Sequence, residues 1–217
     1  VQGAEPDGWD LPSCDDSAWS PVEVADLPQA ELVGPQFAPI QIVGSRPVEQ
    51  WLTSPSGRLI ADFGQVVTGH LRFVLAGRAG SEVCVRVAEV LDGGELAVRP
   101  QRTAANTDRV VLGAAGHLDW EPAFAVRSFR YAELDDPDRV VDRSTVRARL
   151  VRNALARTGW FSCSDAELTR LAENAVWGIA DNMLDVPTDC MLRDERLGWI
   201  GDAAHVAPTA AFLYDTA

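Results

Sequence analysis

Hydrophobic and polar residues alternate along much of the stretch between residues 34 and 137. In one of its runs, Val83, Val85 and Val87 fall on one face of an extended chain, and polar or small residues fall on the other. Turns rich in glycine separate such runs, an early one at Gly64, and no segment with helical spacing lies between them. This pattern is typical of an antiparallel β-sandwich. The strand-like runs cover residues 58–63, 70–75, 82–90, 109–112 and 127–134.

The spacing of the apolar residues changes to a helical period after residue 158. Ser164 and Glu167 form a capping box, in which the serine oxygen accepts from a free backbone N–H and the glutamate reaches back. A second helix is expected to begin near Asp202 as its N-cap, with Pro208 either tolerated early in its length or kinking it. The first helix, of about five turns, is expected to bury one apolar stripe. The stripe consists of Leu168, Leu171, Ala172, Ala175, Val176, Ile179 and Met183. On the second helix, the residues expected to face the core are Val206, Ala207, Ala210 and Ala211.

The order of these elements predicts a multidomain chain, β then α. The turn-rich beginning of the chain is expected to be the tail of a preceding domain or a linker, with Trp9 and Trp19 as anchors. The connection between the two main parts has room for one more strand. The predicted division is a tail at 1–33, a β-sandwich at 34–137, a connection at 138–157 and a helical domain at 158–217.

Charge and composition exclude several kinds of partner. The net charge is −13, and all 19 basic residues are scattered arginines, so a nucleic-acid partner is not expected. No run approaches the roughly 18 apolar residues of a membrane span. The first six residues, Val1 to Pro6, lack the basic and apolar stretches of a secretion signal, which favours a cytoplasmic location.

The four cysteines do not form a metal-binding pattern. Cys14, Cys84, Cys163 and Cys190 contain no CxxC pair and fit no zinc spacing. Cys84 lies in a strand-like run and is expected to be a buried free thiol. The cysteines therefore predict no zinc site, and neither a metal nor a cofactor is expected.

Candidate chemistry gathers between the two predicted helices. The eighteen residues from Asp185 to Asp202 contain five carboxylates, two arginines and one tryptophan, and their proline and glycines predict a shaped loop. Carboxylates and arginines hold sugar hydroxyls, and an aromatic ring covers the apolar face of a sugar. Cleavage of a glycosidic bond also needs a carboxylic acid that protonates the leaving oxygen.

Three other interpretations of this loop stay open on the residues alone. It is also consistent with a solvated loop of Asp–Arg pairs. Asp189, Asp194 and Asp202 are possible ligands of a cation, although their spacing differs from that of an EF-hand. The third interpretation is a serine or cysteine nucleophile, but no serine or cysteine is visibly paired with any of the histidines at 70, 117 and 205. His205 is expected to be a packed histidine.

The loop resembles the signature of the bacterial α-L-rhamnosidases of glycoside hydrolase family 78, Asp-x-Pro-Thr-Asp-Cys-Pro-Gln-Arg-Asp-Glu-Arg-Leu-Gly-Trp-Thr-Gly-Asp. The match runs over residues 185–202 and departs only at Met191, Leu192 and Ile200, apart from the variable second position. Further likeness lies at residues 15–19, 62–65, 88–91 and 159–165, followed by Asn174, Trp177 and Asn182, so it covers nearly the whole chain.

The resemblance implies a fold, a reaction and a set of site residues. The fold is a β-sandwich followed by the first helices of an (α/α)6 barrel, and the reaction is inverting hydrolysis of rhamnose-containing glycosides. Glu195 is then the general acid, and Cys190 is structural. The residues expected to hold rhamnose are Asp189, Arg193, Trp199 and Asp202.

The resemblance also implies that more chain is needed for the reaction. An inverting enzyme needs a second carboxylate as base, which in this family is a glutamate far downstream. Twelve helices of about 11–12 residues each also exceed the length that remains after Trp160. We therefore expect a piece of a longer enzyme that has no turnover alone on an aryl α-L-rhamnoside. A non-catalytic carbohydrate-binding or assembly module, or an (α/α)6 glycosidase for another sugar, are the competing hypotheses.

Overall fold

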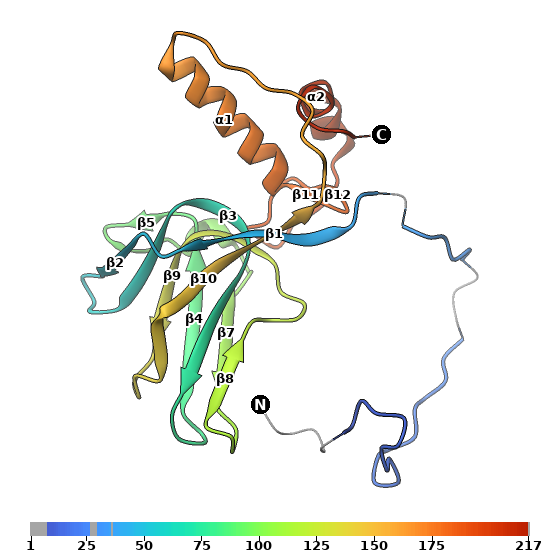
Figure 1. Cartoon of the computed structure of the whole chain (residues 1–217), viewed down its shortest axis with the longest axis vertical. Helices are drawn as coiled ribbons and strands as arrows, with labels where there is room; N and C mark the ends of the chain where they lie inside the picture. The colour runs from blue at the N-terminus through green and yellow to red at the C-terminus, as the bar shows by residue number, and fades with distance from the viewer. Residues whose placement is uncertain (1–7, 27–29, 36, 217) are drawn as a thin grey trace.

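The computed structural model describes residues 8–26, 30–35 and 37–216, and is dominated by one antiparallel sheet followed by two helices (Figure 1). Residues 1–6, on which the expectation about a secretion signal depends, lie outside the described residues. The sheet strands are β1 (Ile40–Pro47), β2 (Gln50–Thr53), β3 (Leu59–Ala76), β4 (Glu82–Ala88), β7 (Thr107–Val111), β8 (His117–Trp120), β9 (Arg127–Asp135) and β10 (Val141–Asn153). The other elements are the strands β5 (Leu91–Asp92), β6 (Glu95–Leu96), β11 (Met183–Leu184) and β12 (Val186–Pro187), the 3-10 turn η1 (Arg99–Gln101), and the helices α1 (Ala166–Asp181) and α2 (Ile200–Leu213).

The eight-stranded sheet is curled around β3, so that it resembles a sandwich. Its order is β1-β10-β3-β9-β4-β7, and β2 and β8 also pair with β3. The first residues of β3 lie between β2 and β9, whereas its last residues lie between β10 and β8. Because one long strand belongs to both parts, the predicted sandwich is a single hydrogen-bonded sheet.

The turn expected at Gly64 is instead a bulge inside β3. Pairing with β9 is interrupted between Asp62 and Val67, and Gly64 has a φ of +78°. Glycine adopts this conformation without the steric penalty of a side chain. The Asp62 carboxylate accepts from the Gly64 amide at 2.7 Å and from Arg130 at 2.8 and 2.9 Å. The two runs at 58–63 and 70–75 are thus parts of one bent strand.

The core fills the space inside the curl. Phe63 and Phe129 are buried and meet edge to face, with ring centroids 5.7 Å apart. Val83, Val85 and Val87 of β4 are all buried, as their alternation predicts. The range expected as a connection holds β10, which pairs with β1 on one side and β3 on the other. The one additional strand for which the sequence left room is therefore a central strand of the sheet.

The helices differ from the sequence prediction at their starts. The N-cap of α1 is Asp165, whose carboxylate accepts from the amides of Glu167 and Leu168, so Ser164 is not the capping residue. A carboxylate is as good an N-cap as a hydroxyl, and here it is one residue closer to the helix. α2 begins at Ile200 with Trp199 as N-cap, which places Asp202 in the first turn.

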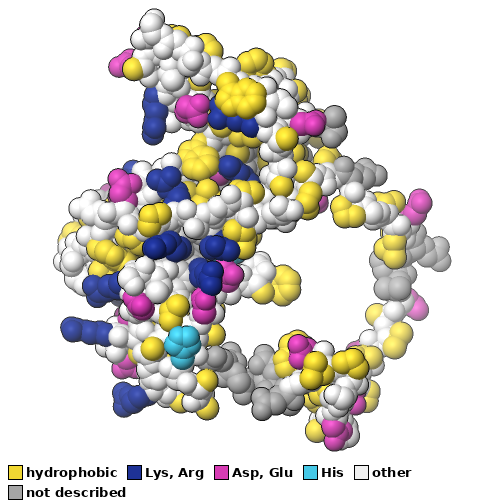
Figure 2. Space-filling model, in the orientation of Figure 1, with side chains coloured by type: hydrophobic (Ala, Val, Ile, Leu, Met, Phe, Trp, Pro, Cys, Tyr) yellow, Lys and Arg dark blue, Asp and Glu magenta, His cyan; other side chains and the backbone are white. Residues whose placement is uncertain are grey.

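Much of the predicted apolar stripe of α1 is exposed. Val176 and Ala180 are buried, but Leu171 is 63% exposed and Leu168 is 50% exposed. On α2, Ala210 and Leu213 are buried, whereas Val206, Ala207 and Ala211, which were also expected to face the core, are exposed. Figure 2 shows hydrophobic side chains on the outer surface of this helical part. The period of the stripe identified the helix, but only the residues near the contact between α1 and α2 are covered.

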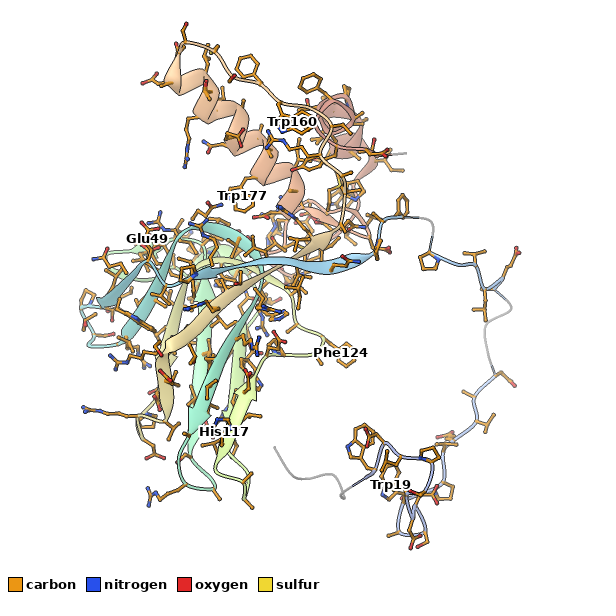
Figure 3. The ribbon with its side chains drawn as sticks, viewed as in Figure 1. Trp19, Glu49, His117, Phe124, Trp160 and Trp177 are labelled. Carbon is orange, nitrogen blue, oxygen red and sulfur yellow. The ribbon has the colours of Figure 1, made fainter. Side chains whose placement is uncertain are left out.

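Two further expectations are not met by the described residues. Trp19 lies on the N-terminal segment away from the sheet, and Trp9 and Trp19 are each about half exposed, so neither is a buried anchor (Figure 3). Cys84 is only partly buried, and burial raises the pKa of its thiol.

None of the helices in the described ranges has the length and apolarity needed to cross a membrane.

Candidate active site

A short hairpin places the carboxylate-rich loop against the sheet. β11 and β12 flank Asp185, which has a φ of +66°. The Asp185 amide donates to Oδ1 of Asn153 at 2.7 Å, and Asn153 is a buried residue at the end of β10. The loop that follows is thus attached at its base to the central part of the sheet.

Asp189 closes this loop on itself. Its backbone N–H donates to the carbonyl of Leu197 at 3.0 Å, and its Oδ1 accepts from the Leu197 N–H at 2.8 Å. The side chain is only 9% exposed, and its other oxygen lies 3.4 Å from Nη2 of Arg193. Burial alone would raise the pKa of Asp189, but hydrogen bonds from Leu197 and Cys190 outweigh it and hold the pKa below its usual range.

The Glu195 carboxylate accepts hydrogen bonds at both oxygens. Oε2 accepts from Nε of Arg193 at 2.9 Å and from Nη1 of Arg102 at 3.0 Å. Oε1 accepts from the indole N–H of Trp199 at 3.1 Å. The side chain is 21% exposed. Arg193 therefore links Glu195 to Asp189, and Trp199 links it to the start of α2.

A cavity of about 470 Å³ lies between α1 and α2, beside this loop. Three of the predicted site residues line it, namely Asp189, Trp199 and Asp202. Glu195 and Arg193 are not among the lining residues, but each contacts a residue that is, Glu195 through Trp199 and Arg193 through Asp189. His205 also lines the cavity, where its Nδ1 is 2.8 Å from the carbonyl oxygen of Gly201, and it is exposed instead of packed.

The sheet contributes residues to the loop that the sequence motif does not contain. Arg102 reaches Glu195, Thr103 donates to Asp194, and Asn106 donates to the carbonyl of Leu192 at 2.7 Å. The Ser128 amide donates to the carbonyl of Met191 at 3.1 Å. These residues precede the loop residues that they contact by 63 to 93 positions, so no local pattern could identify them.

Another pocket, of about 340 Å³, lies between α1, the sheet and the start of the loop, where Asp189 also lines it. Asp181 lines it, and burial raises the pKa of this carboxyl to about 7, although Arg152 at 3.5 Å acts in the opposite direction. The guanidinium of Arg152 also lies 5.1 Å from the ring centre of Trp177, which extends from α1 toward the sheet (Figure 3). The described residues contain no group of three or more metal-binding side chains.

Comparison with known proteins places the two parts of the chain in one class. Residues 52–152 match the model of a bacterial α-L-rhamnosidase concanavalin-like domain. Residues 156–217 match that of a bacterial α-L-rhamnosidase six-hairpin glycosidase domain. A β-domain followed by a glycosidase domain defines the class as multidomain glycoside hydrolases. The chain belongs to the bacterial α-L-rhamnosidase family.

Individual relatives agree with this assignment. The chain is 35% identical over 212 residues to an α-L-rhamnosidase of Streptomyces avermitilis, and this alignment covers 97% of the chain and 21% of the relative. It is 31% identical to one of Alteromonas sp., covering 94% of this chain and 23% of the relative. The chain thus spans about a fifth of the length of these relatives.

Solved structures of α-L-rhamnosidases share the fold. The enzyme from Dictyoglumus thermophilum superposes with a TM-score of 0.90 at 33% identity, over 97% of this chain and 24% of that chain. The Streptomyces avermitilis enzyme, solved in complex with L-rhamnose, has a TM-score of 0.87 at 36% identity, over 95% and 20% of the two chains.

Proposed function

We propose that the enzyme containing this chain removes terminal α-L-rhamnose from rhamnosides with inversion, and that Glu195 is its general acid. The observation that carries the proposal is the position of Glu195 in the family loop. Its carboxylate is bonded to Arg193 and Trp199, which connect it to Asp189 and to the wall of the cavity. A carboxyl held in one orientation beside a sugar-sized cavity is suited to proton transfer.

In the proposed reaction, Glu195 donates its proton to the glycosidic oxygen as the bond from that oxygen to C1 of rhamnose breaks. A water molecule attacks C1 from the opposite face, and a second carboxylate accepts its proton. The base is assigned to a residue outside these 217 residues. The two carboxyl groups of an inverting enzyme lie roughly 6.5–9.5 Å apart, which leaves room for the water.

The remaining site residues are proposed to bind the sugar. Asp189, Arg193 and Asp202 have the charged groups that fix hydroxyl orientation, and the Trp199 ring has the apolar face that covers a sugar ring. Asp189, Trp199 and Asp202 line the cavity. We propose that α1 and α2 are the first helices of an (α/α)6 barrel, in a domain from about residue 158 onward.

The test replaces Glu195 by glutamine in the full-length enzyme. E195Q is expected to lower kcat on methyl α-L-rhamnoside, whose leaving oxygen must be protonated, by about 10²- to 10⁴-fold, the usual contribution of a general acid. Binding of L-rhamnose, measured by calorimetry, should remain close to that of the wild type. The control is E173Q, because Glu173 is half exposed on α1 and pairs with Arg157.

Two results would contradict the proposal. One is a wild-type enzyme that releases no rhamnose from aryl or alkyl rhamnosides, and the other is an E195Q variant as active as E173Q. Proton NMR of the first product formed reports the mechanism, since inversion gives the β-anomer of L-rhamnose. An α-anomer would reject inversion while leaving the substrate assignment intact.

A further inference from the structure

A segment of the sheet domain lies directly against the proposed catalytic loop. This segment, Gln101 to Asn106, begins at the last residue of η1 and ends directly before β7. Three of its side chains donate to the loop: Arg102 to Glu195 at 3.0 Å, Thr103 to Asp194, and Asn106 to the carbonyl of Leu192 at 2.7 Å. The loop is therefore held from outside the helical part of the chain.

The two ends of this segment are anchored in the sheet. Gln101 is buried, and its side-chain amide donates from Nε2 to the backbone carbonyl of Val87 at 2.6 Å. Asn106 is also buried, and its carbonyl accepts from the Val87 N–H at 3.2 Å. Arg102 has a φ of +57°, which a residue with a long side chain adopts only when its surroundings hold it there, and Asn106 has a φ of +44°, which asparagine tolerates more readily. The segment is thus a rigid base from which Arg102 extends.

Arg102 and Arg193 donate to the same oxygen of Glu195. Both guanidinium groups bond Oε2, whereas Oε1 accepts only from the neutral indole of Trp199 among the described residues. In a protonated carboxyl, the carbonyl oxygen is the stronger acceptor and takes the charge-assisted bonds. In the protonated form that the proposed acid role requires, the proton of Glu195 is therefore on Oε1, on the side of Trp199.

From this arrangement, and given the function proposed above, we infer that Arg102 is a positioning residue for Glu195. It holds Oε2 as an acceptor, so that the proton on Oε1 is presented to the glycosidic oxygen. When that proton moves to the oxygen and the C1–O bond breaks, the new charge on Glu195 lies against two cations already in place. Such stabilisation grows as the charge develops, so it lowers the barrier more than it strengthens substrate binding.

The experiment compares R102Q, R102K and R72Q in the full-length enzyme on two substrates. Arg72 is the matched control, because it pairs with Asp119 at a similar exposure and neither residue contacts the loop. Methyl α-L-rhamnoside needs its leaving oxygen protonated, whereas 4-nitrophenolate departs readily without a proton. R102Q is expected to lower kcat about 10- to 100-fold on the methyl glycoside and much less on the aryl glycoside, with KM nearly unchanged.

R102K should recover most of the lost rate, because a cation is restored near Oε2, and R72Q should behave as the wild type. Kinetics of R102Q that match those of R72Q would overturn the inference. Equal losses on both substrates together with a raised KM would also overturn it, because they indicate a disordered loop that no longer holds the sugar. A wild-type enzyme without activity on either glycoside would instead reject the proposed function itself.

Discussion

Trp199 combines two contacts that belong to different parts of the proposed reaction. Its ring lines the cavity and is 48% exposed, while its indole N–H donates to Oε1 of Glu195. The ring is proposed to pack on the sugar, and the N–H to orient the acid. A change that keeps the ring but removes the N–H separates these contacts.

We predict that W199A raises KM for methyl α-L-rhamnoside by about tenfold, because it removes the packing surface for the sugar. W199F keeps an aromatic ring and should leave KM within about threefold of the wild type while lowering kcat, because the bond to Oε1 is lost. Steady-state kinetics of both variants provide the measurement. If the two variants raise KM equally, the ring does not pack on the sugar.

Among the elements, β3 decides how the sheet closes. Gly69 pairs with Leu150 of β10 on one side and with Arg127 of β9 on the other. A Cβ atom at Gly69 would lie 1.7 Å from the backbone oxygen of Arg149. The two strands approach so closely here that any side chain forces the backbone of β10 to move.

We predict that G69A lowers the free energy of unfolding by about 1–3 kcal/mol, the usual cost of overpacking. The control is G44A on β1, because a Cβ atom there meets nothing within 4 Å. It should change stability by no more than about 0.5 kcal/mol. Urea unfolding followed by tryptophan fluorescence measures both. Equal stabilities of the two variants would show that β10 accommodates the methyl group without strain.

At the scale of the whole molecule, the contact between α1 and the sheet contains a buried ionisable pair. Asp181 at the end of α1 faces Arg152 of β10, with Thr68 and Glu89 nearby. Burial raises the pKa of Asp181 from 3.8 to about 7. Between these values the folded protein retains a proton that the unfolded chain has lost. Stability therefore falls as pH rises through this window.

We predict that stability falls by up to about 1.4 kcal/mol per pH unit from this group alone, from about pH 4 to pH 7. D181N cannot lose a proton, so it should remove this slope and gain stability relative to the wild type toward pH 8. The measurement is the midpoint of thermal unfolding of the protein between pH 4 and pH 8. D92N, at an exposed aspartate, is the control and should retain the wild-type slope. Parallel curves for D181N and the wild type would contradict the prediction.

The sequence by itself determined the features that depend on neighbours along the chain. Alternation with a period of two located β4, and a helical period located α1, because these patterns follow from how successive side chains point. The loop motif also lies within eighteen residues, so its carboxylates, arginines and tryptophan could be identified without coordinates. The family resemblance drawn from it is confirmed by the two domain models.

Only the tertiary structure decided which distant residues meet. Two predicted strands are one bent β3 because Asp62 and Gly64 form a bulge instead of a turn, and β10 enters the middle of the sheet. Arg102 reaches Glu195 across 93 positions in the chain, and Asp181 has a raised pKa because packing buries it. Local periodicity has no information on such pairs, since sheet register and burial arise from the packing of the whole chain.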